Sequence, residues 1–259
     1  PEAFEAVDVR SSTGETTGQG RFGYKASGML SIDGTLYLWV GNANNDGAGC
    51  RLAWSTDHAK SWTWADWQIP EFGYLSLLNF GRDYAGARDG FVYGTAHDGP
   101  SEYVAADRYV LMRVPTGRIR ERSAYEFFTG SDSKGEPQWS ANISERGSVL
   151  DNPGKCLRQQ MTYCAPLKRY LWWGQLPNPG VPKDVGDTRF EGGFGVYEAA
   201  EPWGPWRTVF YTDKWDVGPG ETASFPTKWM SESGLEMHLV FSGDDYFSVR
   251  KAALKVAKE

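Results

Sequence analysis

Apolar and polar residues alternate along most of this chain with the two-residue period of β-strands, and helical periodicity is nearly absent. Short turn sequences such as "IDGT" and "ESG" separate the runs. The runs cover 25–42, 50–67, 75–83, 90–98, 107–115, 123–130, 157–176, 192–199, 206–213, 225–231, 236–243 and 246–256. This pattern predicts an all-β protein.

The predicted strands fall into four groups that recur about every 50 to 75 residues. A repeat of about four strands at this spacing is typical of the blades of a β-propeller, and a β-sandwich of similar size is the alternative. We expect residues 1–259 to form a single propeller domain with a flexible N-terminal segment at 1–21, which contains "RSSTGETTGQG".

One short motif supports the blades. The sequence "STDHAKSW" at 55–62 matches the Asp-box pattern S-x-D-x-G-x-x-W, with Ala59 where glycine is usual. In such hairpins the aspartate caps the turn and the tryptophan packs between strands. We therefore expect Asp57 and Trp62 to be scaffold residues and His58 to be an exposed turn residue.

The first strand of each group carries one cation that the pattern places close to its start: Lys25, Arg82, Arg158 and Lys228. First strands of propeller blades line the central axis, so these cations are expected to converge in a funnel. They either pair with carboxylates such as Asp83 and Asp245, or bind a carboxylate-bearing or hydroxyl-rich ligand. The same strands supply three further candidate substrate-binding residues: Asn79, Gln160 and Trp229.

The connection at 96–110 contains the candidate catalytic residues His97, Asp98 and Tyr103. Hydrolysis of a glycosidic bond needs paired carboxyl groups, and Asp98 is the acid/base candidate, with the other two assisting. Elimination from a uronic acid needs a base such as histidine or tyrosine, with a cation such as Arg158 to neutralise the carboxylate. The structural alternative is a solvated, acid-rich turn in which Asp107 bonds to backbone.

Composition narrows the choice of partner. Aromatic residues make up 15% of the chain, with 12 tryptophans, and exposed rings of this kind can stack on sugars. The net charge of −6 argues against nucleic acid, and no apolar run is long enough to span a bilayer. The partner expected is therefore a poly- or oligosaccharide.

The cysteines and His238 are expected to be structural and not part of a catalytic or metal site. Cys50, Cys156 and Cys164 are expected to be free and buried, because the eight residue steps from Cys156 to Cys164 span about 25 Å as a strand, too far for a disulfide. His238 alternates with apolar residues and is expected in the core. No cofactor and no metal site are predicted, since no diagnostic ligand spacing occurs, and a structural calcium ion stays open.

Several segments resemble one known family, among them "KASGML", "SAYEFF", "LKRYLW" and "PWGPW", and the likeness covers most of 22–256. The chain resembles secreted five-bladed β-propellers that include bacterial endo-D-arabinanases, and is similar to propeller glycosidases and rhamnose–glucuronate lyases. The resemblance implies cleavage of glycan linkages, although members of the family differ in reaction. We expect hydrolysis, with a lyase or a non-catalytic glycan-binding propeller as alternatives. It implies a secreted or periplasmic protein, although no signal peptide is present. The family's acidic first blade has no counterpart before "KASGML", so either a further blade lies upstream in the intact protein, which would then have five, or the propeller closes differently.

Overall fold

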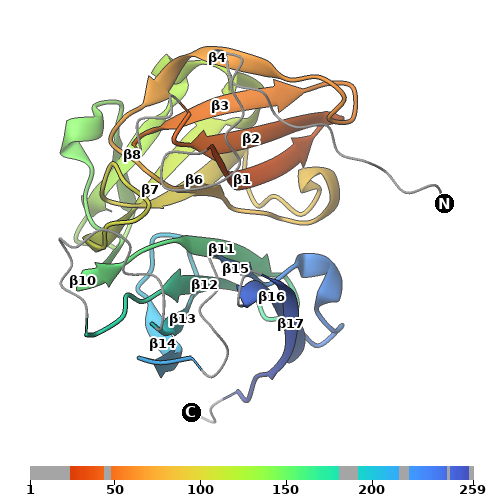
Figure 1. The fold of residues 1–259 in the computed structure, drawn as a ribbon, viewed down its shortest axis with the longest axis vertical. Coiled ribbons are helices and arrows are strands. Elements are labelled where there is room, and N and C mark those ends of the chain that lie inside the picture. Colours follow the sequence, from red (N-terminus) through yellow and green to blue (C-terminus); the bar gives the residue numbers. More distant parts are fainter. Residues whose placement is uncertain (1–23, 44–47, 181–191, 216–221, 244–245, 257–259) are drawn as a thin grey trace.

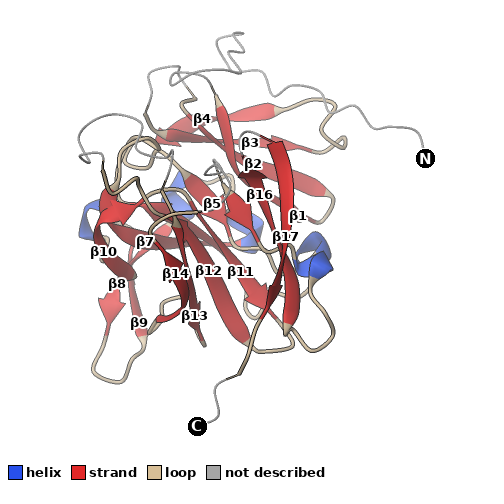
Figure 2. Ribbon diagram, turned by 60° about the horizontal axis from the view of Figure 1, so that its bottom comes forward, coloured by secondary structure: helices blue, strands red, loops and turns tan. Residues whose placement is uncertain are grey.

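The described residues of the computed structural model, 24–43, 48–180, 192–215, 222–243 and 246–256, form four antiparallel β-sheets. The sheets are arranged around a common axis as a four-bladed β-propeller (Figures 1 and 2). We number them blade 1 to blade 4 in chain order. The all-β propeller predicted from the strand groups is confirmed.

Strands within each blade follow the chain order. Blade 1 contains β1 (Lys25–Ile32), β2 (Thr35–Gly41), β3 (Cys50–Ser55) and β4 (Thr63–Ile69). Blade 2 contains β5 (Leu75–Leu77), β6 (Phe91–His97), β7 (Ala106–Pro115), β8 (Glu126–Ser131) and β9 (Pro137–Ser140), and β10 (Leu150–Cys156) pairs with β7. Blade 3 contains β11 (Gln159–Cys164), β12 (Arg169–Gln175), β13 (Phe194–Ala199) and β14 (Arg207–Thr212). Blade 4 contains β15 (Ala223–Ser224), β16 (Glu236–Gly243) and β17 (Tyr246–Ala253).

Short 3-10 helices interrupt the loops, and their bounds are η1 (Arg82–Tyr84), η2 (Thr116–Arg118), η3 (Arg122–Ala124), η4 (Ile143–Glu145) and η5 (Thr227–Trp229).

The first strand of each blade lies next to the first strand of the following blade. β1 packs against β5, β5 against β11, and β11 against β15. A parallel bridge between Asn79 and Thr162 shows that the chain runs in one direction along β5 and β11. The contact between β1 and β5 is close, because a Cβ added to Gly28 would lie 2.8 Å from the Leu77 nitrogen. The innermost position is confirmed for the predicted strands at Lys25 and Arg158, which are β1 and β11. In blades 2 and 4 it is held by β5 and β15, which end before the predicted starts at Leu78 and Pro226.

Two clusters of buried side chains hold the blades together. The larger joins blades 1 to 3 and includes Trp39, Phe72 and Trp172, all at most 1% exposed. The smaller joins blades 3 and 4 and includes Trp173 and Trp215. Many of the tryptophans are therefore core residues, and the three cysteines are free and buried as expected.

Two inner strands are shorter than predicted. The strand expected at 75–83 ends at Leu77, after which Gly81 (φ 95°) leads into η1. The segment 225–231 is not a strand, because Pro226 lacks the N–H that a sheet ladder needs and its carbonyl accepts the Trp229 N–H. β9 and β10 were not predicted, since each contains a proline that weakens the strand pattern.

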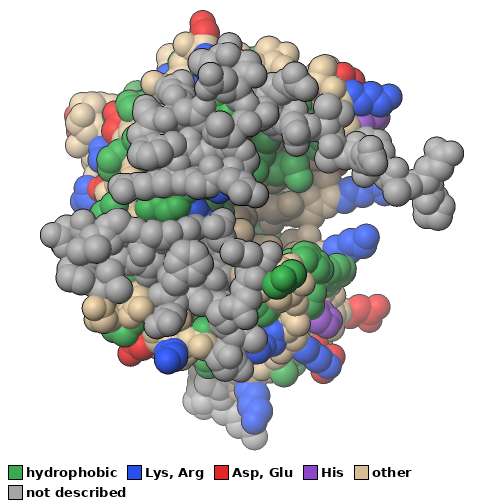
Figure 3. Space-filling model, viewed as in Figure 1, with side chains coloured by type: hydrophobic (Ala, Val, Ile, Leu, Met, Phe, Trp, Pro, Cys, Tyr) green, Lys and Arg blue, Asp and Glu red, His purple; other side chains and the backbone are tan. Residues whose placement is uncertain are grey.

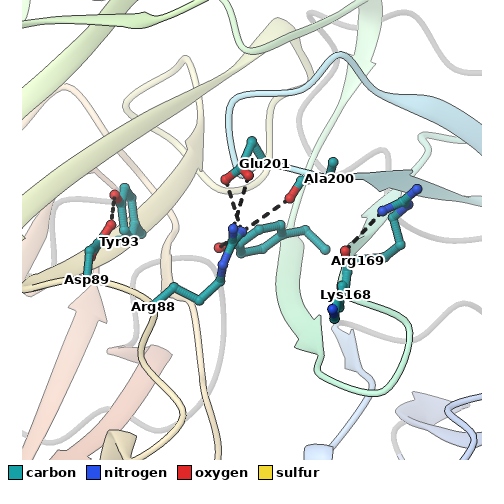
Figure 4. A network of polar contacts seen from close by, with 8 residues as sticks. Arg88, Asp89, Tyr93, Lys168, Arg169, Ala200 and Glu201 are labelled. Atoms are coloured by element: carbon teal, nitrogen blue, oxygen red, sulfur yellow. Dashed lines mark hydrogen bonds and ion pairs between the residues drawn. The ribbon is translucent and has the colours of Figure 1, made fainter.

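An arginine clasp joins blades 2 and 3 at the loop that follows η1 (Figure 4). Arg88 donates to both carboxylate oxygens of Glu201, at 3.0 and 3.1 Å, and to the Tyr170 hydroxyl at 3.2 Å. Its guanidinium also lies over the rings of Tyr163 and Tyr170. Blades 1 and 4 face each other across a groove. The fifth blade expected from the sequence stays a prediction.

Candidate functional site

A groove of about 650 Å³ runs along the axis between blade 1 and blade 4. We call it the axial groove. Figure 3 shows the surface hollowed between the upper and lower halves of the view. Its lining includes Met29, Tyr74, Asn79, Gln160, Thr222 and Phe247, so all four blades contribute to it.

The polar groups of the axial groove are neutral amides and hydroxyls. Gln160 donates its amide nitrogen to the Leu77 carbonyl at 2.9 Å, and Asn79 accepts the Gly81 N–H through its oxygen at 2.7 Å. These bonds fix the orientation of each amide, and each remaining amide atom has no partner among the described residues. Fixed amides and hydroxyls of this kind suit a ligand that offers both donors and acceptors.

Tyr74 and Thr222 tie blade 2 to blade 4 at the groove through a 2.9 Å hydrogen bond between their hydroxyls. Burial raises the pKa of Tyr74 above its ordinary value, so the phenol stays protonated and neutral. The sequence pattern identifies neither residue, because neither lies in a polar cluster or a recognisable motif.

A buried ion pair lies behind the groove wall. An Arg158 guanidinium nitrogen lies 2.9 Å from a Glu102 carboxylate oxygen, and the two side chains are 3% and 0% exposed. The guanidinium packs over the ring of Tyr74, which lines the groove, at 5.8 Å. Arg158 therefore follows the predicted alternative of internal pairing, although with Glu102 as its partner.

His97 is enclosed. Its side chain has no exposed surface, and its Nε2 lies 2.9 Å from the Ser101 carbonyl. Burial first, and then the charge of Arg158, lower the pKa of His97, which is about 4. The neutral ring therefore donates from Nε2. Tyr103 is also buried, with 2% exposed.

Asp98 is held by two arginines. One carboxylate oxygen accepts from Arg108 Nε at 2.6 Å and the other from Arg146 Nε at 2.8 Å, and the side chain is 10% exposed. It lies in a separate hollow of about 390 Å³. The three predicted catalytic residues are therefore absent from the axial groove lining. Asp107 accepts the Gly154 N–H at 2.8 Å, which confirms the backbone role expected for it as the structural alternative.

The predicted convergence of four cations is wrong. Lys25 and Arg158 stand at the start of β1 and directly before β11, whereas Arg82 and Lys228 lie beyond the ends of β5 and β15. The neighbouring inner strands β5 and β11 run in one direction, so Arg158 and Arg82 lie toward opposite ends of that strand pair. Arg82 and Lys228 are exposed, and Lys25 is half-buried.

Of the predicted substrate-binding residues, Asn79 and Gln160 line the axial groove. Trp229 is 40% exposed and lines a second pocket on blade 4. The binding role of each residue in this set stays a prediction.

The described part of the chain holds no group of three or more His, Cys, Asp or Glu side chains placed to bind a metal ion. Within the same residues, no helix has the length and apolar character needed to cross a bilayer.

No protein-family model and no curated protein matches this chain. Among solved structures, it is similar to an exo-beta-1,3-galactanase from Phanerochaete chrysosporium with galactose, at 11% identity and a TM-score of 0.40 over 94% of this chain and 62% of that one. It is similar to a GH43_1 enzyme from Xanthomonas citri at 13% identity and a TM-score of 0.43, over 88% of this chain and 68% of that one. It is also similar to Trypanosoma rangeli sialidase in complex with the inhibitor DANA, at 9% identity and a TM-score of 0.44, over 89% of this chain and 32% of that one.

Proposed function

We propose that this protein binds an oligo- or polysaccharide in the axial groove and hydrolyses its glycosidic bonds. The observation that carries the proposal is the groove itself: about 650 Å³, with fixed amides at Asn79 and Gln160 and aromatic rings at Tyr246 and Phe247. Sugars present hydroxyl groups at their edges and C–H groups on their faces, which such a lining complements.

Hydrolysis is favoured over elimination. A lyase acting on a uronic acid needs a free cation to neutralise the substrate carboxylate. Arg158, the candidate for that role, is buried and paired with Glu102. The resemblance of the sequence motifs covers both glycosidases and lyases and does not decide between the two reactions. Because the resembled family includes endo-D-arabinanases, arabinan belongs in the set of substrates to test.

The catalytic carboxyl groups are the second part of the proposal. Hydrolysis needs two of them. We propose Asp98 as the acid/base, as the sequence suggests, and the second carboxyl group is not among the described residues that line the groove. Glu102 acts as a positioning residue, because it holds Arg158 against Tyr74 at the groove wall. Movement of the loop between β6 and β7 would have to bring Asp98 to the substrate.

The test is a panel of polysaccharides, arabinan included, scored for reducing ends and for unsaturated uronate absorbance. We expect reducing ends without absorbance. Gln160→Ala should weaken binding by roughly tenfold, because it removes one fixed amide from the groove. Gln138→Ala, which alters an exposed amide on β9, is the matched control and should bind as the parent does.

A non-catalytic glycan-binding propeller is the second candidate. It is favoured by one observation, that no carboxylate is among the described residues lining the axial groove. Binding that depends on Gln160, with no reducing ends released from any substrate and no effect of Asp98→Asn, would select this function. For either function we expect a secreted or periplasmic protein, where polysaccharides are encountered.

A further inference from the structure

A second pocket, of about 500 Å³, lies on blade 4. It is lined by Trp229, Met230, Ser231, Glu236, His238 and Val249. Trp229 belongs to η5, and Glu236 and His238, which form the polar rim of the pocket, belong to β16. We call it the Trp229 pocket.

The Trp229 pocket and part of the axial groove lining lie on one face of the same sheet, although Phe241 of the opposite face also reaches the groove. Along β16, Glu236 and His238 line the pocket while Val240 and Ser242 line the groove. These four positions alternate, so their side chains share a face. On β17, Val249 of the pocket pairs with Val240 of the groove.

The loop before β16 joins the two sites as well. Thr227 lines the groove and Trp229 lines the pocket, and two residues of chain span about 7 Å at most. A chain-like ligand in the groove can therefore continue into the pocket without leaving the surface.

This face of blade 4 differs from the face that packs in the core. The opposite face of β16 presents Met237, Leu239 and Phe241, all buried in the cluster between blades 3 and 4. The open face carries Glu236, whose carboxylate lies 2.9 Å from the Lys251 amine, with both side chains 57% exposed. Covering such a pair with another sheet would remove its solvation at a substantial cost, so the face suits a hydrated ligand.

The ring of Trp229 is held in place beside the polar rim. His238 meets it edge to face, with centroids 6.2 Å apart and planes at 85°, and His238 Nδ1 lies 3.3 Å from the Trp229 carbonyl. The second ring nitrogen of His238 has no hydrogen-bond partner among the described residues. The expectation that His238 is a core residue is wrong, because it sits half-buried at the edge of this pocket.

We propose that the Trp229 pocket is an outlying subsite for a glycan chain that also occupies the axial groove. The indole ring stacks on a sugar face, and His238 and Ser231 contact its hydroxyl groups. A cationic ligand is disfavoured, because the Glu236 carboxylate already has Lys251 as its counter-ion. The subsite rests on the proposed function, since it requires that the groove bind a glycan.

The test compares Trp229→Ala, Trp229→Phe and Gln160→Ala for binding to a long polysaccharide and to a short oligosaccharide of the same sugar, by affinity electrophoresis and calorimetry. Trp229→Ala should weaken binding of the long chain by roughly tenfold and leave the short one unchanged. Trp229→Phe should retain most of the affinity, because a ring remains. Gln160→Ala should weaken both ligands.

The outcomes separate the two proposals. If Gln160→Ala weakens binding and Trp229→Ala does not, the subsite is wrong and the groove stands. If no glycan binds the parent protein, both are wrong. If another part of the protein covers the face, the share of the fluorescence that acrylamide quenches will be the same in the parent and in Trp229→Phe, and Trp229→Ala will lower thermal stability without a length-dependent change in affinity. This outcome also overturns the subsite.

Discussion

At the scale of single residues, the turn at 55–62 uses an unusual backbone position. Asp57 accepts the Ser61 N–H at 2.9 Å and the Ser61 hydroxyl at 2.6 Å, and the Ala59 N–H bonds to Ser55 Oγ at 2.9 Å. The two bonds from Ser61, that of its hydroxyl most of all, and the bond that the Ser55 hydroxyl donates to Asp57 at 2.8 Å lower the pKa of Asp57 to about 2. Ala59 sits at φ 66°, a left-handed conformation that its Cβ disfavours.

Replacing Ala59 by glycine should therefore stabilise the protein. The left-handed conformation costs an alanine roughly 1 to 2 kcal/mol, and the greater freedom of glycine in the unfolded chain offsets part of this gain. We expect a net increase of about 0.5 kcal/mol in the free energy of unfolding, measured with urea. Gly117→Ala, at an open position on η2, gives the ordinary effect of such an exchange for comparison. A decrease on Ala59→Gly would show that the strain is absent.

His97 makes stability depend on pH. Burial lowers its pKa to about 4 in the folded protein, from 6.5 in an exposed chain. Between these values the unfolded chain binds a proton that the folded one does not. The stabilisation is therefore fully present above pH 6.5 and is lost toward pH 4, by about 1.4 kcal/mol for each pH unit.

The measurement is urea unfolding at pH 7 and pH 5 for the parent and for His97→Gln. The variant should be less stable than the parent at pH 7, because it alters a buried hydrogen bond. Between pH 7 and pH 5, however, its free energy of unfolding should fall by less than that of the parent. An equal loss in both proteins would assign the pH dependence to other groups.

At the scale of elements, prediction succeeded where one face of a strand meets the core and the other meets water. β16 runs from Glu236 to Gly243 as the alternation of "EMHLVFSG" predicts. The inner strands β5 and β15 are short, and β5 is buried on both faces, so alternation does not mark their ends. The cations were misplaced for this reason.

The candidate site was likewise predicted in part, where its residues lie near strands that the sequence identifies. Asn79 and Gln160 were predicted and line the axial groove, because they lie on or beside inner strands that the grouping identified. Tyr74 and Thr222 were not predicted, because the lining of the groove comes from separate segments of all four blades that no single stretch of sequence brings together. The loop at 96–110 was predicted as a polar cluster. In the structure, however, His97 and Tyr103 are buried, and Asp98 forms ion pairs with two arginines. No sequence pattern specifies such side-chain directions.

At the scale of the whole molecule, the position of blade 1 depends on the close contact between β1 and β5. A Cβ on Gly28 would lie 2.8 Å from the Leu77 nitrogen and from the Ser76 Cα, which are backbone atoms and cannot rotate away. Gly28→Ala should therefore push blade 1 from blade 2 and lower the free energy of unfolding by about 1 to 3 kcal/mol. Gly117→Ala is the control, because nothing lies within 4 Å of its added Cβ.

The same change should reach the ligand. Ala26 to Met29 line the axial groove, so a displaced β1 widens it. We expect glycan affinity to fall in the fraction of Gly28→Ala that remains folded, while Gly117→Ala binds as the parent does. Calorimetric titration below the unfolding temperature makes this measurement. Unchanged affinity in a destabilised variant would mean that the glycan is held by blades 2 to 4 alone, and that blade 1 supports the fold without forming the site.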